Sequence, residues 1–406
     1  MFLEILALIV VGVLFGIVTG LTPGVHINLV SAILVTISPF LLKFLDPFSL
    51  VMFVIAMAIT HSFLDFIPSV FLGVPEPETA VSVMPAHRML LEGQGFEAVK
   101  LTAIGSLLAV ICCIALMPLL IIVMPLLYGK ISKFIGYILI IAVLFIIFRE
   151  KTWDKKFWAF FVFSMAGILG VLALNFPSLN EPLFPLLSGM FGISMLVTSL
   201  QNNAVIPKQR TTEHIVVSKK LMSASTASGT VAGALVGLLP GLGPAQATII
   251  GSLFVGGIET IGTVGYLMMQ GSINVVNFVV SVATFFTIDK VRNGAVVAVQ
   301  QIIGKISLSQ MLMILAGTLL VAGIATFLTV KIVRIFSKIV EKLNYKLLSL
   351  SIIALIVVLC IVLSGFVGLL VLAVSTAIGI IPIVLGIEKN HSMGCILLPV
   401  IFYFVL

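Results

Sequence analysis

Two uncharged stretches of 38 residues each constrain the fold of this chain more than any other feature. They run from Ile5 to Leu42, with His26 counted as neutral, and from Leu221 to Ile258. A hydrocarbon core of about 30 Å takes roughly 20 apolar residues per helical crossing, so each stretch is too long for one crossing and fits two short helices. Of the 406 residues, 61% are hydrophobic and 9% are charged, unlike a soluble domain. We therefore expect an all-α polytopic membrane protein.

Both stretches carry the same motif, at a constant offset of 217 residues. In Gly12 to Gly24 and in Gly229 to Gly241, three glycines at every fourth position are followed by a Pro-Gly pair. Such glycines line one helix face and let a neighbouring helix approach closely, and close packing alone would explain them. The Pro-Gly pair predicts a broken helix, which is tolerated at membrane depth only where it is buried or lines a polar cavity. Each 38-residue stretch either crosses the membrane twice or folds back as a re-entrant hairpin.

The charged loops between the apolar segments indicate the orientation of the chain. Three apolar segments separate the repeats, 131–148, 157–175 and 182–205, and an odd number of crossings inverts the second repeat relative to the first. With the N-terminus outside, sixteen lysines and arginines fall inside and six fall outside, as the positive-inside rule expects. The net charge of +7 then reports topology, and nucleic acid is not expected as a partner. We predict about 10–14 membrane segments in the cell membrane, with the first segment retained.

The predicted domains follow from these repeats. Residues 1–130 form inverted repeat 1, with its broken helix and a polar loop at 73–100. Residues 131–218 form three connecting transmembrane helices, and residues 219–346 form inverted repeat 2. Three C-terminal transmembrane helices are expected in residues 347–406.

Polar residues near the two breaks, together with two acids, are the candidate site residues. If new helices begin at Val25 and Leu242, their free N–H groups form positive ends that suit a carboxylate or phosphate. Acids near membrane depth are costly and often functional, although a helix-end acid facing water is the plain alternative. The predicted substrate-binding residues are Pro23, Gly24, Val25, His26, Thr79, Pro240, Gly241, Leu242, Gly243 and Gln246. The predicted coupling-ion residues are Asn28, Ser62, Asp65, Thr248, Thr287 and Asp289, the two acids being paired at an offset of 224.

Three segments carry a family resemblance: Gly20 to Gly24, Gly237 to Pro244, and the loop from Pro75 to Ala98. They resemble the TctA family, the large membrane subunit of tripartite tricarboxylate transporters. Glu76 stands where that family tends to have Gly and Ser82 where it has Asp, so the chain resembles a short, divergent member. The resemblance implies uptake of a carboxylate anion, with a small membrane subunit and an extracytoplasmic binding protein as partners in the better-known members.

The predicted function is secondary active transport of an organic anion. Importing an anion against an interior-negative potential costs about 2.3 kcal/mol per charge per 100 mV, so we expect coupling to Na⁺ or H⁺ and no other cofactor. One alternative is a lipid-phosphate (polyprenyl-phosphate) translocase, because helix N-termini suit phosphate as well. Others are a membrane scaffold subunit or an intramembrane aspartyl enzyme that uses Asp65 and Asp289. Phosphate-binding and hydrolase motifs are missing from the sequence, so an ATP-driven pump is not expected. A homodimer is left open.

Overall fold

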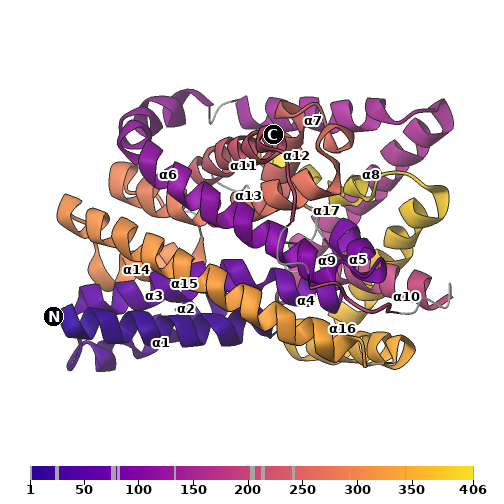
Figure 1. Ribbon diagram of the computed structural model, residues 1–406. Coiled ribbons are helices and arrows are strands. Elements are labelled where there is room, and N and C mark those ends of the chain that lie inside the picture. Colours follow the sequence, from indigo (N-terminus) through magenta and orange to yellow (C-terminus); the bar gives the residue numbers. More distant parts are fainter. Residues whose placement is uncertain are drawn as a thin grey trace. The chain divides into compact units, whose positions relative to one another are not determined.

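The computed structural model describes residues 2–22, 27–74, 79, 83–131, 134–201, 206–211, 215–239, 243–291, 293–342 and 344–405. Every regular element within these residues is a helix (Figure 1), so the all-α prediction is confirmed for this part of the chain. Nine of the described helices are long and apolar enough to cross a membrane, and two shorter ones, Ile135–Arg149 and Gly294–Ile303, are also apolar.

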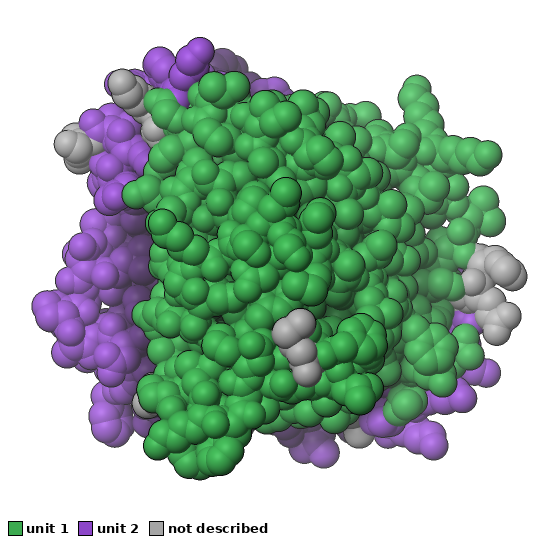
Figure 2. All heavy atoms as spheres, turned by 90° about the vertical axis from the view of Figure 1, so that its left-hand side faces the viewer, with its two compact units in different colours: residues 1–68, 96–129, 212–335 green, residues 69–95, 130–211, 336–406 purple. Residues whose placement is uncertain are grey.

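The chain divides into two compact units, each built from three separate stretches (Figure 2). Unit 1 contains residues 1–68, 96–129 and 212–335, and unit 2 contains residues 69–95, 130–211 and 336–406. Most of both predicted repeats falls in unit 1. The greater part of the predicted polar loop, up to residue 95, falls in unit 2 with the connecting and C-terminal helices.

Helices α1 and α2 lie on either side of the first Pro-Gly pair, and α11 and α12 lie on either side of the second. Thus each 38-residue stretch holds two helices, as expected from its length. The pairs themselves, with Val25, His26 and Leu242, lie outside the described residues. The helices of unit 1 are α1 (Phe2–Leu21), α2 (Ile27–Leu41), α3 (Pro47–Leu64), α6 (Gly95–Ile131), α11 (Lys219–Leu238), α12 (Pro244–Phe254), α13 (Ile258–Ile288), α14 (Gly294–Ile303) and most of α15 (Leu308–Val340).

The three glycines of each motif are the contact points of a helix pair. A Cβ atom added at Gly12 would lie 2.5 Å from the Phe53 carbonyl oxygen, and one added at Gly229 would lie 2.6 Å from the Met269 carbonyl oxygen. In this way α1 packs against α3, and α11 packs against α13, with backbone approaching backbone. The glycines therefore have the close-packing role that their spacing indicates.

The two helix pairs share one packing register. Gly12, Gly16 and Gly20 meet the carbonyl groups of residues 53, 57 and 61, whereas Gly229, Gly233 and Gly237 meet those of residues 269, 273 and 277. The glycines are offset by 217 residue numbers and their partners by a constant 216. The repeat seen in the sequence is therefore also a repeat of helix packing, and it includes α3 and α13.

Helix α13 packs against several other helices of unit 1. It contacts α3, α11, α12 and α14, and α6 crosses it at Gly105 and Gly271, where an added Cβ would lie 2.1 Å from the Met268 and Thr102 carbonyl oxygens. Two hydrogen bonds fasten this crossing: Ser106 Oγ donates to the Gly271 carbonyl at 2.9 Å, and Ser272 Oγ donates to the Gly105 carbonyl at 3.0 Å. Helix α14, which contacts α13, also packs against α2 and α3.

Unit 2 is also held together by glycines that admit a neighbouring backbone. A Cβ added at Gly170 of α8 would lie 1.9 Å from the Cys395 carbonyl oxygen, and one at Gly379 of α16 would lie 2.3 Å from the Met190 carbonyl oxygen. Helix α16 contains a break at Gly365, whose φ of 68° suits glycine. The helices of unit 2 are the end of α4 (Phe66–Phe71), α5 (Val83–Leu91), α7 (Ile135–Arg149), α8 (Trp153–Leu174), α9 (Leu183–Leu187), the π-helix η3 (Ser188–Ile193), α10 (Ser194–Gln201), α16 (Tyr345–Leu385), the 3₁₀ helix η4 (Lys389–Met393) and α17 (Gly394–Val405).

Candidate functional site

A row of polar side chains follows one face of α13 in unit 1. Gln270 and Asn274 are four residues apart and therefore lie on the same helix face. Their exposed fractions are 0% and 3%, so both amides are buried among apolar helices. Buried amides need hydrogen-bond partners, and these partners come from α12 on one side and α3 on the other.

Asn274 contacts the last turn of α3. Its Nδ2 atom donates to Asp65 Oδ2 at 2.8 Å and to the Ser62 carbonyl oxygen at 3.3 Å. Asp65 ends α3 at the C-cap and is 1% exposed. The charged form of a carboxylate buried to this degree is costly unless hydrogen bonds or a cation offset the loss of water. Asp65 and Ser62, two of the predicted coupling-ion residues, therefore lie together, and Asn274 lies beside them.

Gln270 contacts the beginning of α12. Thr248 Oγ1 donates a short hydrogen bond to Gln270 Oε1 and also bonds the Pro244 carbonyl at 2.8 Å. Thr248 is a predicted coupling-ion residue of the second repeat. Gln270 and Asn274 thus connect the first turns of α12 with the last turn of α3. We name Thr248, Gln270, Asn274, Asp65 and Ser62 the polar line.

Two predicted substrate-binding residues form the cap of α12. Gly243 has an extended backbone and is the N-cap, and its N–H donates to Gln246 Oε1 at 2.9 Å. This hydrogen bond holds the amide oxygen of Gln246, a residue that is 2% exposed, at the helix N-terminus. The positive end of the helix dipole favours an oxygen ligand at this position.

A buried histidine lies one turn before Asp65 on α3. His61 Nδ1 and Thr19 Oγ1 of α1 are 3.1 Å apart, and Thr19 also bonds the Gly16 carbonyl at 3.3 Å. The contact joins α3 to the end of α1, just before the first Pro-Gly pair. Asn28 lies in the first turn of α2, but its side chain is outside the described part of the structure.

Thr287 and Asp289 lie elsewhere, at the C-terminal end of α13. Asp289 is exposed, has a left-handed φ of 55° and accepts a long hydrogen bond of 3.5 Å from Gln300. Both residues line a cavity of about 400 Å³ that also contains Lys305. At about 1.5 Å of rise per residue, Asp289 is on the order of 22 Å along the helix from Asn274. The helix-packing register pairs Asp65 with Ser281, at an offset of 216, rather than with Asp289.

Thr79 belongs to unit 2 and is buried there. Its hydroxyl lies 2.6 Å from Ser69 Oγ, and Ser69 also donates to the Val74 carbonyl at 3.3 Å. Nearby, His87 Nδ1 lies 2.9 Å from the Val70 carbonyl oxygen. Burial lowers the pKa of His87 to about 4, so this histidine is neutral at physiological pH. Pro23, Gly24, Val25, His26, Pro240, Gly241 and Leu242, also predicted to bind substrate, are outside the described residues.

The two amides of the polar line were not among the predicted site residues. The prediction followed acids and the residues next to the breaks. Gln270 and Asn274 carry a signal of their own, because two amides four residues apart in an apolar helix lie on one face and need polar partners there. Within the described residues, no group of three or more His, Cys, Asp or Glu side chains is placed to hold a metal ion. The Asp65 carboxylate and the Ser62 carbonyl oxygen are instead the kind of oxygen ligand that suits a hard cation, and a carboxylate also binds a proton.

Comparisons with known proteins cover nearly the whole chain. The sequence model described as the tripartite tricarboxylate transporter TctA family matches residues 6–394. An uncharacterized protein of Methanocaldococcus jannaschii is 31% identical over 406 residues, which is 98% of each chain. No solved structure matches the chain.

Proposed function

Because this chain belongs to the tripartite tricarboxylate transporter TctA family, we propose that it carries a di- or tricarboxylate anion across the cell membrane as a secondary active transporter. Family membership supports the role of a tricarboxylate transporter component and agrees with the resemblance found in the sequence. A small membrane subunit and an extracytoplasmic binding protein are its proposed partners. The proposed driving force is a gradient of Na⁺ or H⁺, because the membrane potential opposes anion entry by about 2.3 kcal/mol per charge per 100 mV.

The contact between Asp65 and Asn274 is the observation that carries the proposed coupling. A carboxylate that is 1% exposed changes its charge when it binds a proton and loses its net charge when it binds Na⁺. Asn274 holds this carboxylate from the second repeat, whereas Asp65 and Ser62 belong to the first. Loading or release of a cation at Asp65 would therefore change the charge at the contact between α3 and α13, and with it the strength of the hydrogen bond from Asn274.

The anion is proposed to bind near the two helix breaks. The N-terminus of α12 already holds an amide oxygen, Gln246 Oε1, and a substrate carboxylate offers the same kind of ligand with a full charge. Thr248, the member of the polar line in the second turn of α12, lies close to this end, because its hydroxyl contacts the Pro244 carbonyl as well as Gln270. We propose that the repeats are inverted, that the N-terminus is outside, and that alternating access moves one repeat against the remainder.

Uptake by two polar-line variants tests the coupling. Labelled di- and tricarboxylates are offered to proteoliposomes under imposed Na⁺ or pH gradients, with and without the two proposed partner subunits. Asp65→Asn keeps the size of the side chain and removes its charge, so gradient-driven accumulation should be lost. Asn274→Ala removes the amide that orients Asp65. The concentration of coupling cation that gives half-maximal uptake should therefore rise by about 10–100-fold.

Ser281→Ala is the matched control. Ser281 occupies the place of Asp65 in the second packing register, but its hydroxyl bonds its own helix at the Asn277 carbonyl, 2.7 Å away. Uptake by this variant should stay close to that of the wild-type chain. Unchanged uptake and unchanged cation dependence in Asp65→Asn would contradict the proposed coupling site. The complete lack of carboxylate uptake by the wild-type chain, even with both partners, would contradict the proposed substrate class.

A further inference from the structure

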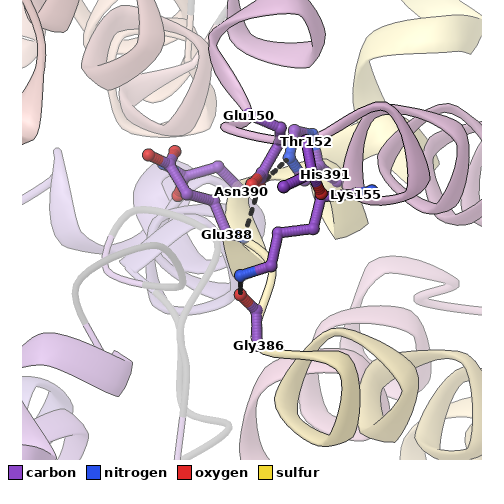
Figure 3. A network of polar contacts seen from close by, with 7 residues as sticks. All are labelled: Glu150, Thr152, Lys155, Gly386, Glu388, Asn390 and His391. Carbon is purple, nitrogen blue, oxygen red and sulfur yellow. Dashed lines mark hydrogen bonds and ion pairs between the residues drawn. The ribbon is translucent and has the colours of Figure 1, made fainter.

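A second network of polar contacts lies in unit 2, around the turn between α16 and α17 (Figure 3). Glu150 Oε1 accepts hydrogen bonds from the Glu388 N–H at 2.9 Å and from His391 Nε2 at 3.1 Å. Lys155 Nζ donates to the Gly386 carbonyl oxygen at 2.8 Å. The turn 386–393 is thus fastened to Glu150, at the end of α7, and to Lys155, in the first turn of α8.

Lys389, in the same turn, is directed to different partners. Its Nζ atom donates to Ser194 Oγ at 2.8 Å and to the Phe191 carbonyl oxygen at 3.5 Å, and it lies 5.9 Å from the centre of the Phe191 ring. Only 7% of this lysine is exposed. Its partners belong to η3 and α10, and short π-helical turns inside helices are frequently found at functional sites.

The neighbouring carboxylates are engaged by other groups. Glu150 is bonded by His391 and the Glu388 N–H, and Glu388 Oε2 accepts from Asn390 Nδ2 at 3.4 Å. Lys389 forms no ion pair within the described residues. The other titratable groups on the elements that contact η4 are Asp154, Lys155 and Lys156 on α8, Tyr345, Lys346 and Cys360 on α16, and Cys395 and Tyr403 on α17. A buried ammonium without a counter-ion is costly, and burial lowers the pKa of Lys389 to about 7.

Both protonation states of Lys389 keep the observed hydrogen bonds. Ser194 uses its own hydroxyl hydrogen on the Met190 carbonyl at 2.6 Å, so its lone pairs face the lysine. A neutral amine has two N–H groups, enough for Ser194 Oγ and the Phe191 carbonyl. The third N–H of the ammonium adds a contact only with the Phe191 ring. The surroundings of Lys389 therefore accept a proton without rearrangement of these partners.

We propose that Lys389 is a proton-binding site, through which H⁺ is the cation that this chain couples to anion transport. The coupling to transport rests on the proposed function, whereas proton binding by Lys389 stands on its own contacts. A di- or tricarboxylate carries several negative charges, so its import needs more than one cation, and Lys389 adds a site to that of the polar line.

Protonation is tested first, without any transport, by the thermal stability of the purified chain as a function of pH. The unfolded chain binds a proton at Lys389 up to about pH 10, whereas the folded chain releases it near 7. Between these values the unfolded state binds more protons, so the melting temperature of the wild-type chain should rise with pH relative to Lys389→Met. Lys151→Met, which changes an exposed lysine of the α7–α8 connection, should follow the wild-type curve. A constant difference between wild type and Lys389→Met would overturn the assignment.

Ser194→Ala provides a second variant that keeps the lysine, in case Lys389→Met does not fold. It removes the 2.8 Å partner of Nζ and should shift the pH at which the melting temperature of the chain begins to rise. An unshifted transition in Ser194→Ala would likewise overturn the assignment.

Coupling is tested next, by uptake in proteoliposomes under a pH gradient. Lys389→Met should lose accumulation driven by the pH gradient and keep the exchange of internal for external carboxylate. Full pH-driven accumulation in Lys389→Met would overturn the coupling. If the wild-type chain carries no carboxylate at all, the proposed function fails, and the stability measurement still decides whether Lys389 binds the proton.

Discussion

Asp65 and Asp289 have the same side chain but lie in very different environments. Asp65 is held by Asn274 in the interior of unit 1 and is 1% exposed. Asp289 ends α13 in a left-handed conformation and is exposed beside Lys305. The cost of a buried charge, and with it the gain from binding a cation, applies to the first acid and hardly to the second. Of the two predicted acids, Asp65 is therefore the stronger candidate for coupling.

The contribution of Glu150 to the stability of the fold should depend on pH. Burial raises the pKa of Glu150, but the hydrogen bonds from His391 and the Glu388 N–H, with the charges of His391 and Lys155, outweigh it and lower the pKa overall. A carboxylate whose pKa is lowered on folding stabilises the fold above its unfolded pKa, and this stabilisation is lost as the pH falls through the folded pKa. Glu150→Gln should cost about 1 kcal/mol of stability at neutral pH.

The measurement is thermal unfolding of Glu150→Gln and wild type at several pH values. The two curves should approach each other in acid, where the wild-type carboxyl is also neutral. Glu388→Gln is the control, because the Glu388 side chain accepts only a 3.4 Å hydrogen bond from Asn390. A difference that persists unchanged in acid would show that the charge of Glu150 has no part in fastening the turn.

At the scale of elements, the packed glycines predict a graded loss of stability. A Cβ at Gly16 would lie 2.5 Å from Thr60 Cβ and 2.7 Å from the Met57 carbonyl oxygen. At the equivalent Gly233 the nearest atoms are 3.0 and 3.1 Å away. Overpacking of this kind costs about 1–3 kcal/mol, so Gly16→Ala should destabilise the chain more than Gly233→Ala.

Gly323→Ala is the control for this series. No atom lies within 4 Å of a Cβ built at Gly323, which faces outward from α15. Alanine is the better helix former by about 0.5–1 kcal/mol, so this variant should be at least as stable as the wild-type chain. Melting temperatures in detergent rank the three variants. If Gly233→Ala had the lowest melting temperature of the three, the difference in contact distance between the two glycines would not explain their effect on stability.

Helices and their close contacts were predictable from local pattern, whereas the polar line was not. The glycine spacing indicates the faces of α1 and α11 that pack, and Pro-Gly indicates where each helix ends. The contact of Asn274 with Asp65 joins residues 209 positions apart, and it depends on the rotation of α13 against α3, which no local pattern contains. Gln246 shows the same limit, because a polar residue beside a break serves equally as a ligand or as a helix cap.

For the whole molecule, the charge distribution predicts which ends of the helices face the cytoplasm. Lys151 and Lys305 are both exposed and belong to loops assigned to opposite sides of the membrane. In a background from which the four free cysteines have been removed, Lys151→Cys should react with an impermeant maleimide only from the cytoplasmic side. Lys305→Cys should react only from outside.

Labelling of intact and opened cells distinguishes the two orientations. The opposite pattern would reverse the topology, and labelling of both positions from one side would exclude the predicted crossings between them. The fold class and the family were predictable from composition and motifs. The assembly of each unit from three separate stretches was not, because it depends on contacts between helices far apart in the chain.

The shared packing register also indicates which positions of the two motif copies can differ in residue type. Where two backbones touch, as at Gly12 and Gly229, no side chain larger than hydrogen fits, so neither copy tolerates drift there. One turn beyond the last of these contacts the register imposes no such limit, and the position equivalent to Asp65 is Ser281. The same packing of two helix pairs can therefore carry a buried charge in one pair and a neutral hydroxyl in the other, so the two halves of unit 1 differ chemically where their architecture is the same.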